Sequence, residues 1–115
     1  MYYTYVVRVE GGALYTGIAK DLFCRMADHL GQGKRCAKYT RSRRILSLEM
    51  LWSSADRGTA SRLEYALKTL NKSQKEALIR NERLTWRYLP RLDREDYVHH
   101  PEARLDLFRT RPPAD

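Results

Sequence analysis

Alternating and periodic hydrophobic positions divide the first 84 residues of the chain into strands and helices. Two segments rich in β-branched and aromatic residues flank a pair of glycines, which is a hairpin signal. A later apolar run is typical of a buried strand, and two further segments carry leucine or methionine at helical spacing. A capping box formed by Ser73 and Glu76 opens one more helix. The expected strands are residues 2–9, 14–18 and 45–53, and the expected helices are residues 22–30, 59–70 and 73–83.

The order of these elements, strand–strand–helix–strand–helix–helix, predicts the fold class. An antiparallel hairpin followed by helices and one more strand is typical of an α+β fold. We therefore expect a small antiparallel three-stranded sheet flanked by helices. From Thr85 onward four prolines interrupt a mixed segment. We assign residues 1–84 to one domain and residues 85–115 to a C-terminal extension that is partly packed and frayed at its end.

The loop of the hairpin decides which side chains share a face of the sheet. A three-residue loop, residues 10–12, with a glycine in the left-handed region pairs residues whose numbers have an even sum. Tyr5 then pairs near Gly17 and Tyr15 pairs near Val7, so both tyrosines lie on one face. A two-residue loop would place them on opposite faces. We predict the longer loop.

Composition and charge narrow the class of partner. The 115 residues carry a formal net charge of +8, which favours a polyanion such as nucleic acid. No apolar run approaches the roughly 20 residues of a membrane span, and the first residues lack the basic and apolar regions of a secretory signal. We therefore expect a cytoplasmic protein without membrane contact, in which Cys24 and Cys36 are free thiols.

Residues that can carry chemistry gather in the first expected strands and helix. The stretch from Tyr15 to His29 reads Tyr-x-Gly-x-x-x-Asp-Leu-x-x-Arg-x-x-x-His. It is preceded by a strand that contains Tyr5 and is followed by Glu64 on an expected helix. This combination resembles the GIY-YIG nuclease superfamily, in particular its small standalone bacterial members, over roughly residues 2–84. The resemblance implies an enzyme that hydrolyses phosphodiester bonds with one divalent metal ion.

The residue types in the pattern suit that reaction. Glu64 offers a carboxylate for Mg²⁺ or Mn²⁺, which prefer oxygen ligands, and we expect no small-molecule cofactor. Arg25 offers a planar fork that stabilises charge on phosphate oxygens. The resemblance implies that Tyr15 is the general base, with Tyr5 and His29 as assistants or alternatives. The ordinary pKa of tyrosine, about 10, is high for this task, whereas that of histidine is near neutral. The identity of the base stays open.

A basic segment follows the first expected helix and adjoins the proposed cleft. It contains no acidic residue, and its tyrosine could stack on a base. We expect the basic side chains to contact the phosphate backbone without reading sequence. The expected nucleic-acid-binding residues are Lys20, Lys34, Arg35, Lys38, Tyr39, Arg41, Arg43, Arg44 and Lys68.

The sequence therefore favours a metal-dependent endonuclease. DNA is favoured over RNA as the substrate, with a structure preference or weak sequence specificity, and the family resemblance suggests DNA repair or recombination. One alternative is a non-catalytic nucleic-acid-binding module with the same fold. Another is a protein-interaction adaptor that uses the proline-rich tail. The presence of Tyr15, Arg25, His29 and Glu64 together favours the enzyme.

Replacing Arg41, Arg43 and Arg44 with alanine should weaken nucleic-acid binding and flatten its salt dependence. Each lost phosphate contact removes about one unit from the slope of log affinity against log salt concentration. Binding titrations at several salt concentrations measure this slope. An unchanged slope would place the segment outside the interface.

Overall fold

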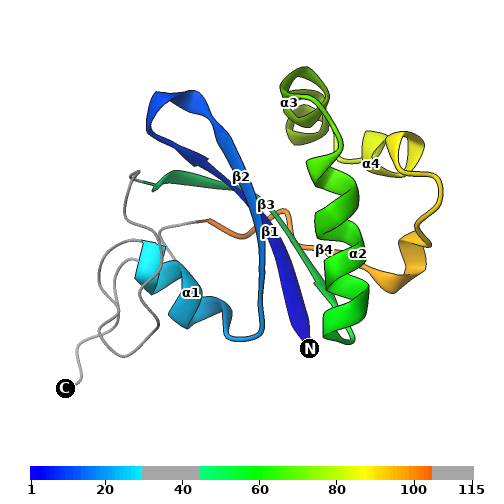
Figure 1. Ribbon diagram of the computed structural model, residues 1–115, viewed down its shortest axis with the longest axis horizontal. Coiled ribbons are helices and arrows are strands. Elements are labelled where there is room, and N and C mark those ends of the chain that lie inside the picture. The colour runs from blue at the N-terminus through cyan, green and yellow to red at the C-terminus, as the bar shows by residue number, and fades with distance from the viewer. Residues whose placement is uncertain (30–44, 105–115) are drawn as a thin grey trace.

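The computed structural model describes residues 1–29 and 45–104 of the chain. It contains a four-stranded antiparallel sheet in the order β2-β1-β3-β4, with helices on both faces (Figure 1). The α+β fold class is confirmed. None of the described helices combines the length and apolarity that a membrane span requires. The strands are β1 (Tyr2–Val9), β2 (Leu14–Ala19), β3 (Ile45–Ser54) and β4 (Val98–His99), the α-helices are α1 (Leu22–His29), α2 (Arg57–Lys68), α3 (Lys72–Arg80) and α4 (Leu84–Tyr88), and the 3-10 helices are η1 (Glu10–Gly12) and η2 (Arg94–Asp96).

The sheet has one strand more than the three expected. β4 pairs with β3 through two residues, with His99 opposite Trp52 and Val98 opposite Ser53. A strand of this length has no alternating pattern that the sequence could reveal. α4 was not predicted either, because α3 ends at Arg80 and a new helix begins a few residues later.

Part of the segment expected as an extension packs into the described structure. Thr85, Leu89 and Tyr97 are buried, and Leu89 and Tyr97 join the hydrophobic cluster that covers one face of the sheet. The division of the chain at residue 84 stays a prediction.

β1 and β2 are joined by residues 10–12 in the longer loop, as predicted. The Val9 N–H donates to the Ala13 carbonyl oxygen at 2.9 Å. Gly11 and Gly12 have φ angles of 88° and 90°, a region that residues with a Cβ rarely adopt. The paired glycines therefore make the three-residue turn possible.

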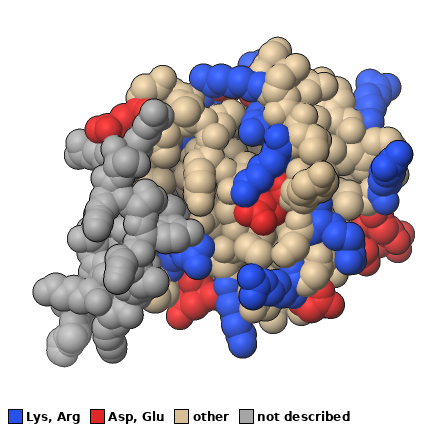
Figure 2. Space-filling view, viewed as in Figure 1, with Lys and Arg blue, Asp and Glu red and all other residues tan. Residues whose placement is uncertain are grey.

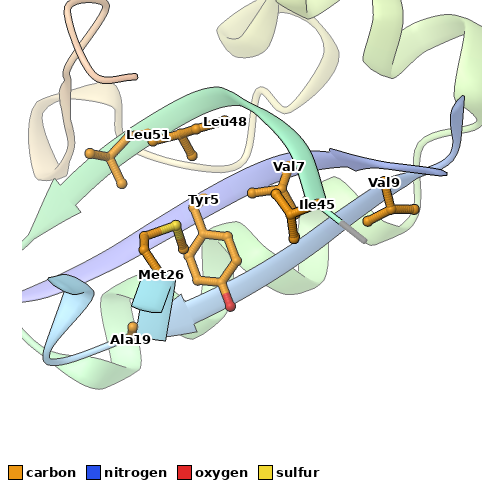
Figure 3. Close-up of a cluster of buried hydrophobic side chains, with 8 residues drawn as sticks. All are labelled: Tyr5, Val7, Val9, Ala19, Met26, Ile45, Leu48 and Leu51. Carbon is orange, nitrogen blue, oxygen red and sulfur yellow. The ribbon is translucent and has the colours of Figure 1, made fainter. Parts of the chain in front are cut away.

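Each face of the sheet carries its own hydrophobic cluster, because successive side chains of a strand alternate between the faces. On one face Tyr5 and Val7 pack with Met26 of α1 (Figure 3). On the other face Val6 and Trp52 pack with leucines of the later helices. These leucines are Leu63 and Leu67 of α2, Leu78 of α3 and Leu89 after α4.

α3 begins at Lys72, one residue earlier than expected, and its N-cap is Asn71 in place of Ser73. Its capping box is formed by Asn71 and Gln74, whose side chains exchange hydrogen bonds with each other's backbone N–H at 2.8 and 3.0 Å. The expected box of Ser73 and Glu76 is wrong, because asparagine is an equally good N-cap and precedes the serine. Glu76 consequently lies inside the helix and reaches another partner.

That partner is Arg8 of β1, which links the hairpin to β3 and α3. Arg8 Nη1 and Nη2 donate to the two carboxylate oxygens of Glu76 at 2.7 and 2.9 Å. Arg8 Nε donates to Glu49 of β3 at 3.0 Å, and Nη1 donates to the Gly12 carbonyl oxygen at 3.2 Å. The hydrogen bonds from Arg8 lower the pKa of Glu76, and those same bonds raise the pKa of Arg8.

The substitution Glu76→Gln should lower the free energy of unfolding by about 1 kcal/mol, because a two-bond charged pair becomes a weaker neutral contact. In a domain of this size that corresponds to a fall in Tm of roughly 4–8 °C. Thermal melts followed by circular dichroism at pH 7 measure it. Glu95→Gln is the matched control, since Glu95 is exposed and forms no ion pair with the described residues.

The difference in free energy of unfolding between wild type and Glu76→Gln should depend on pH in a defined direction. The pKa of Glu76 in the folded protein lies below its ordinary value of 4.5. The contribution of the pair is therefore fully present above that value and is lost as the pH falls through the folded-state pKa. Urea unfolding of wild type and Glu76→Gln should differ at pH 7 and converge in acid. An equal difference at both pH values would contradict the assignment.

Candidate active site at the edge strand

β2 lies at one edge of the sheet, and a helix flanks it on each side. Among the described strands, β2 pairs with β1 on one side and lies at the edge of the sheet. α1 packs against the face that carries Tyr5, whereas α2 packs against the other face and contacts both β1 and β2. Figure 1 shows β2 between α1 and α2. β2 therefore lies between the helix that carries Arg25 and the helix that carries Glu64.

The two motif tyrosines lie on one face of the hairpin, as predicted. Tyr5 is opposite Gly17 and Val7 is opposite Tyr15 in the β1–β2 register. Tyr5 is fully buried, whereas Tyr15 is 40% exposed. Of the two phenols, Tyr15 is therefore the one that a ligand outside the protein can reach.

Gly17 provides the space in which the Tyr5 ring lies. A Cβ on Gly17 would be 2.5 Å from the Tyr5 hydroxyl oxygen and 2.7 Å from Cζ. Figure 3 shows the ring beside Met26 with its hydroxyl end directed toward β2. Sequence reasoning found this glycine only as a member of the Tyr-x-Gly pattern. The structure gives the physical reason: any side chain here would collide with the phenol.

α1 begins with the cap that the sequence predicts and places Arg25 beside β2. The Asp21 Oδ1 atom accepts a hydrogen bond from the Cys24 backbone N–H at 2.9 Å. Arg25 Nη1 donates to the Ile18 carbonyl oxygen of β2 at 3.0 Å. The bond orients the guanidinium against the edge strand.

The first turn of α2 is tied to its surroundings by three hydrogen bonds. The Asp56 side chain accepts from the Thr59 N–H at 2.8 Å, so the helix begins two residues earlier than expected. Thr4 of β1 donates to the Ala60 carbonyl oxygen at 3.2 Å, and the Tyr97 hydroxyl donates to the Thr59 carbonyl oxygen at 2.8 Å. Together with the buried leucines, these bonds fix the orientation of α2.

Glu64 lies in the middle of α2 and forms an ion pair with Lys68. The Glu64 Oε2 and Lys68 Nζ atoms are 3.0 Å apart, and the side chains are 22% and 52% exposed. The spacing of four residues places both on one side of the helix. Partly exposed pairs of this kind contribute roughly 1 kcal/mol or less. A cation that binds the carboxylate more strongly can therefore replace the lysine.

The donor set suits only some metals. Among the described residues, no group of three or more His, Cys, Asp or Glu side chains is arranged to hold a metal ion. Mg²⁺ and Mn²⁺ fit a single carboxylate such as Glu64, because they retain waters and bind substrate phosphate oxygens. Zn²⁺ usually takes three or four protein ligands, and the described residues offer no such set.

Other expected site residues are placed less completely. Lys20 is exposed directly after β2. His29 is the last residue of α1, and its side chain lies outside the described part of the structure, as do residues 34–44 with seven of the nine expected nucleic-acid contacts. Cys24 is disulfide-bonded, so the expectation of a free thiol at this position is wrong, and Cys36 lies outside the described residues.

The charges on one surface suit a phosphate-bearing ligand. In Figure 2, Lys and Arg side chains surround a small acidic patch near the centre of the face, over the region between β2 and α2. A carboxylate set among cations can hold a metal ion while the cations attract a polyanion. The charges on this face are therefore suited to a polyanion with a metal ion.

Comparison with known proteins gives a consistent assignment. The family model of the GIY-YIG catalytic domain matches residues 1–77 of the chain. The UPF0213 protein FN1575 of Fusobacterium nucleatum is 38% identical over 78 residues, covering 68% of this chain and 76% of the relative. The UPF0213 protein YE0453 of Yersinia enterocolitica is 39% identical over 82 residues, covering 71% and 82%. The solution NMR structure of the UPF0213 protein BH0048 of Bacillus halodurans has 30% identity and a TM-score of 0.43, covering 69% of this chain and 83% of that chain.

The chain belongs to the GIY-YIG family. GIY-YIG is a nuclease family, so membership implies a nucleic-acid substrate, and its nucleases generally use divalent metal ions. The roles of the individual site residues stay predictions.

Substituting Gly17→Ala should destabilise the protein by about 1–3 kcal/mol, because the added methyl group and the Tyr5 phenol need the same space. Urea unfolding measures the loss. Adding Tyr5→Phe removes the hydroxyl oxygen, which is the atom nearest to the new methyl group. The double variant should therefore lose less stability than the two single variants lose together.

Gly58→Ala is the control for this substitution. An added Cβ at Gly58 has its nearest neighbours at 3.6 and 3.9 Å, which is ordinary contact. Alanine also favours the helix more than glycine does, so this variant should be as stable as wild type or slightly more so. A Gly17→Ala protein that unfolds like Gly58→Ala would refute the role of the Tyr5–Gly17 contact.

Proposed function

We propose that this protein is a divalent-metal-dependent endonuclease that hydrolyses phosphodiester bonds in DNA. The observation that carries the proposal is the position of β2. This edge strand presents the exposed Tyr15, and the helices that carry Arg25 and Glu64 flank it on its two sides. A phosphodiester laid along this edge would have a phenol, a guanidinium and a carboxylate within its reach.

Glu64 would hold Mg²⁺ or Mn²⁺ in place of its ion pair with Lys68. The bound ion supplies positive charge to the phosphate oxygens and lowers the pKa of a coordinated water. Lys68, once displaced, stays on the same side of α2 and is available to a neighbouring phosphate.

The remaining residues act on the phosphate and on the attacking water. Arg25 stabilises the charge that develops on the phosphate oxygens, since its fork can donate two parallel hydrogen bonds. Tyr15 takes the proton of the water, with His29 as the alternative base. We assign Tyr5 a positioning role, because its side chain has no exposed surface and its ring packs over Gly17, two residues along the strand from Tyr15.

DNA is proposed over RNA, with the contacts spread along the phosphate backbone. Lys20 and the basic residues of 34–44 supply these contacts, and they give affinity without sequence readout. Preference for a DNA structure and a role in repair or recombination are part of the same proposal.

A non-catalytic binding module is the second candidate, and the ion pair of Glu64 with Lys68 is the observation that favours it. In such a module the carboxylate would remain bound to the lysine and the protein would hold DNA without cutting it. Both candidates share the same surface, so only an activity measurement separates them.

The test compares wild type with Glu64→Gln, Arg25→Ala and Tyr15→Phe on single-stranded, nicked, branched and duplex DNA, with and without Mg²⁺ or Mn²⁺. Loss of a charge-stabilising or metal-binding group should reduce the cleavage rate by about 100-fold or more, while DNA binding persists. Chelation of the metal should abolish cleavage by wild type. Glu95→Gln serves as the control carboxylate and should cleave at the wild-type rate. Tight binding by wild type without cleavage under every condition would establish the second candidate.

A further inference from the structure

A pocket of about 610 Å³ opens between α2 and the segment that follows α4. Its walls are mostly apolar and include the rings of Tyr65 and Tyr88, and its cations are Arg62 and Arg91. None of the described residues that line it is acidic. The volume falls in the range of sites for small organic ligands or parts of larger ones. The combination of flat apolar surface with positive charge suits an aromatic group attached to an anion.

The pocket borders the side of α2 that carries Glu64. Ser61 and Tyr65 line the pocket, and Glu64 lies three residues after Ser61. Lys68 lies three residues after Tyr65. Residues three apart on a helix are neighbours on its surface. A nucleic-acid strand whose phosphate lies at Glu64 would therefore bring an adjoining nucleotide to the mouth of the pocket.

Tyr65 is the side chain best placed to meet that nucleotide. It is 74% exposed although it is large and apolar, and it forms no ring contact with another described residue. Unpaired bases commonly stack on exposed aromatic rings beside basic groups, because every base has a π-face whatever the sequence. Arg91 is also exposed and forms no ion pair within the described part of the chain.

We propose that this pocket binds an unpaired base next to the cleaved phosphate, with Tyr65 stacking on the base and Arg91 binding the adjoining phosphate. The inference rests on the proposed nuclease function, because it places the phosphate at Glu64. It names the substrate class more closely: nucleic acid with unpaired nucleotides, such as gaps, flaps or single strands. In an uninterrupted duplex the bases are stacked on each other and cannot enter.

The segment that completes the pocket lies outside the GIY-YIG match. That match ends at residue 77, whereas Tyr88 to Leu92 form the wall opposite α2. Glu64 and Tyr65 belong to the matched part. The preference for unpaired nucleotides is therefore a property that this chain adds to its GIY-YIG domain through the residues after α4.

The experiment uses full-length protein carrying Glu64→Gln, so that the substrate stays intact, and two DNA probes of one sequence. Both contain the fluorescent base 2-aminopurine, in one probe within a single-stranded gap and in the other fully paired. We expect affinity for the gapped probe to be roughly tenfold higher, with quenching of 2-aminopurine as it stacks on Tyr65. Tyr65→Ala should abolish both the preference and the quenching, and Tyr65→Phe should retain them.

Charge variants test the second contact. Arg91→Ala should weaken binding of the gapped probe several-fold and reduce the slope of its salt dependence by about 0.7. Arg83→Ala, which removes an exposed arginine that does not line the pocket, should retain the preference for the gapped probe. Thermal melts confirm that each variant is folded, which is expected because both pocket side chains are exposed.

The outcomes separate this inference from the nuclease proposal. Equal affinity of the parent protein for both probes, or a full preference in Tyr65→Ala, would overturn the pocket assignment even where the wild type cleaves DNA. A preference that depends on Tyr65, in a protein whose wild type cleaves nothing, would support the pocket and refute the nuclease.

Discussion

The close approach of the Tyr5 phenol to the bare Cα of Gly17 is the contact on which the rest of the arrangement depends. It requires β1 and β2 to pair in one register, and that register requires the three-residue turn with two left-handed glycines. A slip of one residue would move every side chain of β2 to the other face. Thr16 or Ile18 would then lie opposite Tyr5, where a branched side chain and the ring would need the same space.

From this register follows the geometry of the candidate site. With Tyr15 on the α1 face and α2 on the other face, the groups proposed to act on a phosphate come from both sides of the sheet, and β2 is the edge strand of the described sheet between them. Arg8 holds the turn of the same hairpin against β3 and α3 through its bonds to Glu49 and Glu76. The ion pairs of Arg8 thus stabilise the position of the turn, and hydrophobic packing stabilises the hairpin along its length.

The sequence predicted the structural features that are determined by residues close together along the chain. The three long strands, the turn, the Asp21 cap and the leucine stripe of α2 all have local signals, and the structure confirms them. The capping box of α3 was misplaced because two overlapping patterns, Asn71 with Gln74 and Ser73 with Glu76, compete within six residues. β4, α4 and the pocket of Tyr65 and Arg91 gave no signal, since each exists only where distant segments pack together.

The hydrogen bond from Tyr97 to the Thr59 carbonyl oxygen has a consequence for how the chain can be divided. It joins the helix that carries Glu64 to a segment 38 residues later, well past the portion that the family model matches. The portion that the family model matches is therefore packed against and hydrogen-bonded to a later segment of this protein. In a chimera with another domain, a junction at residue 77 would remove the tyrosine that donates to α2 and the later side chains that pack over the same face of the sheet.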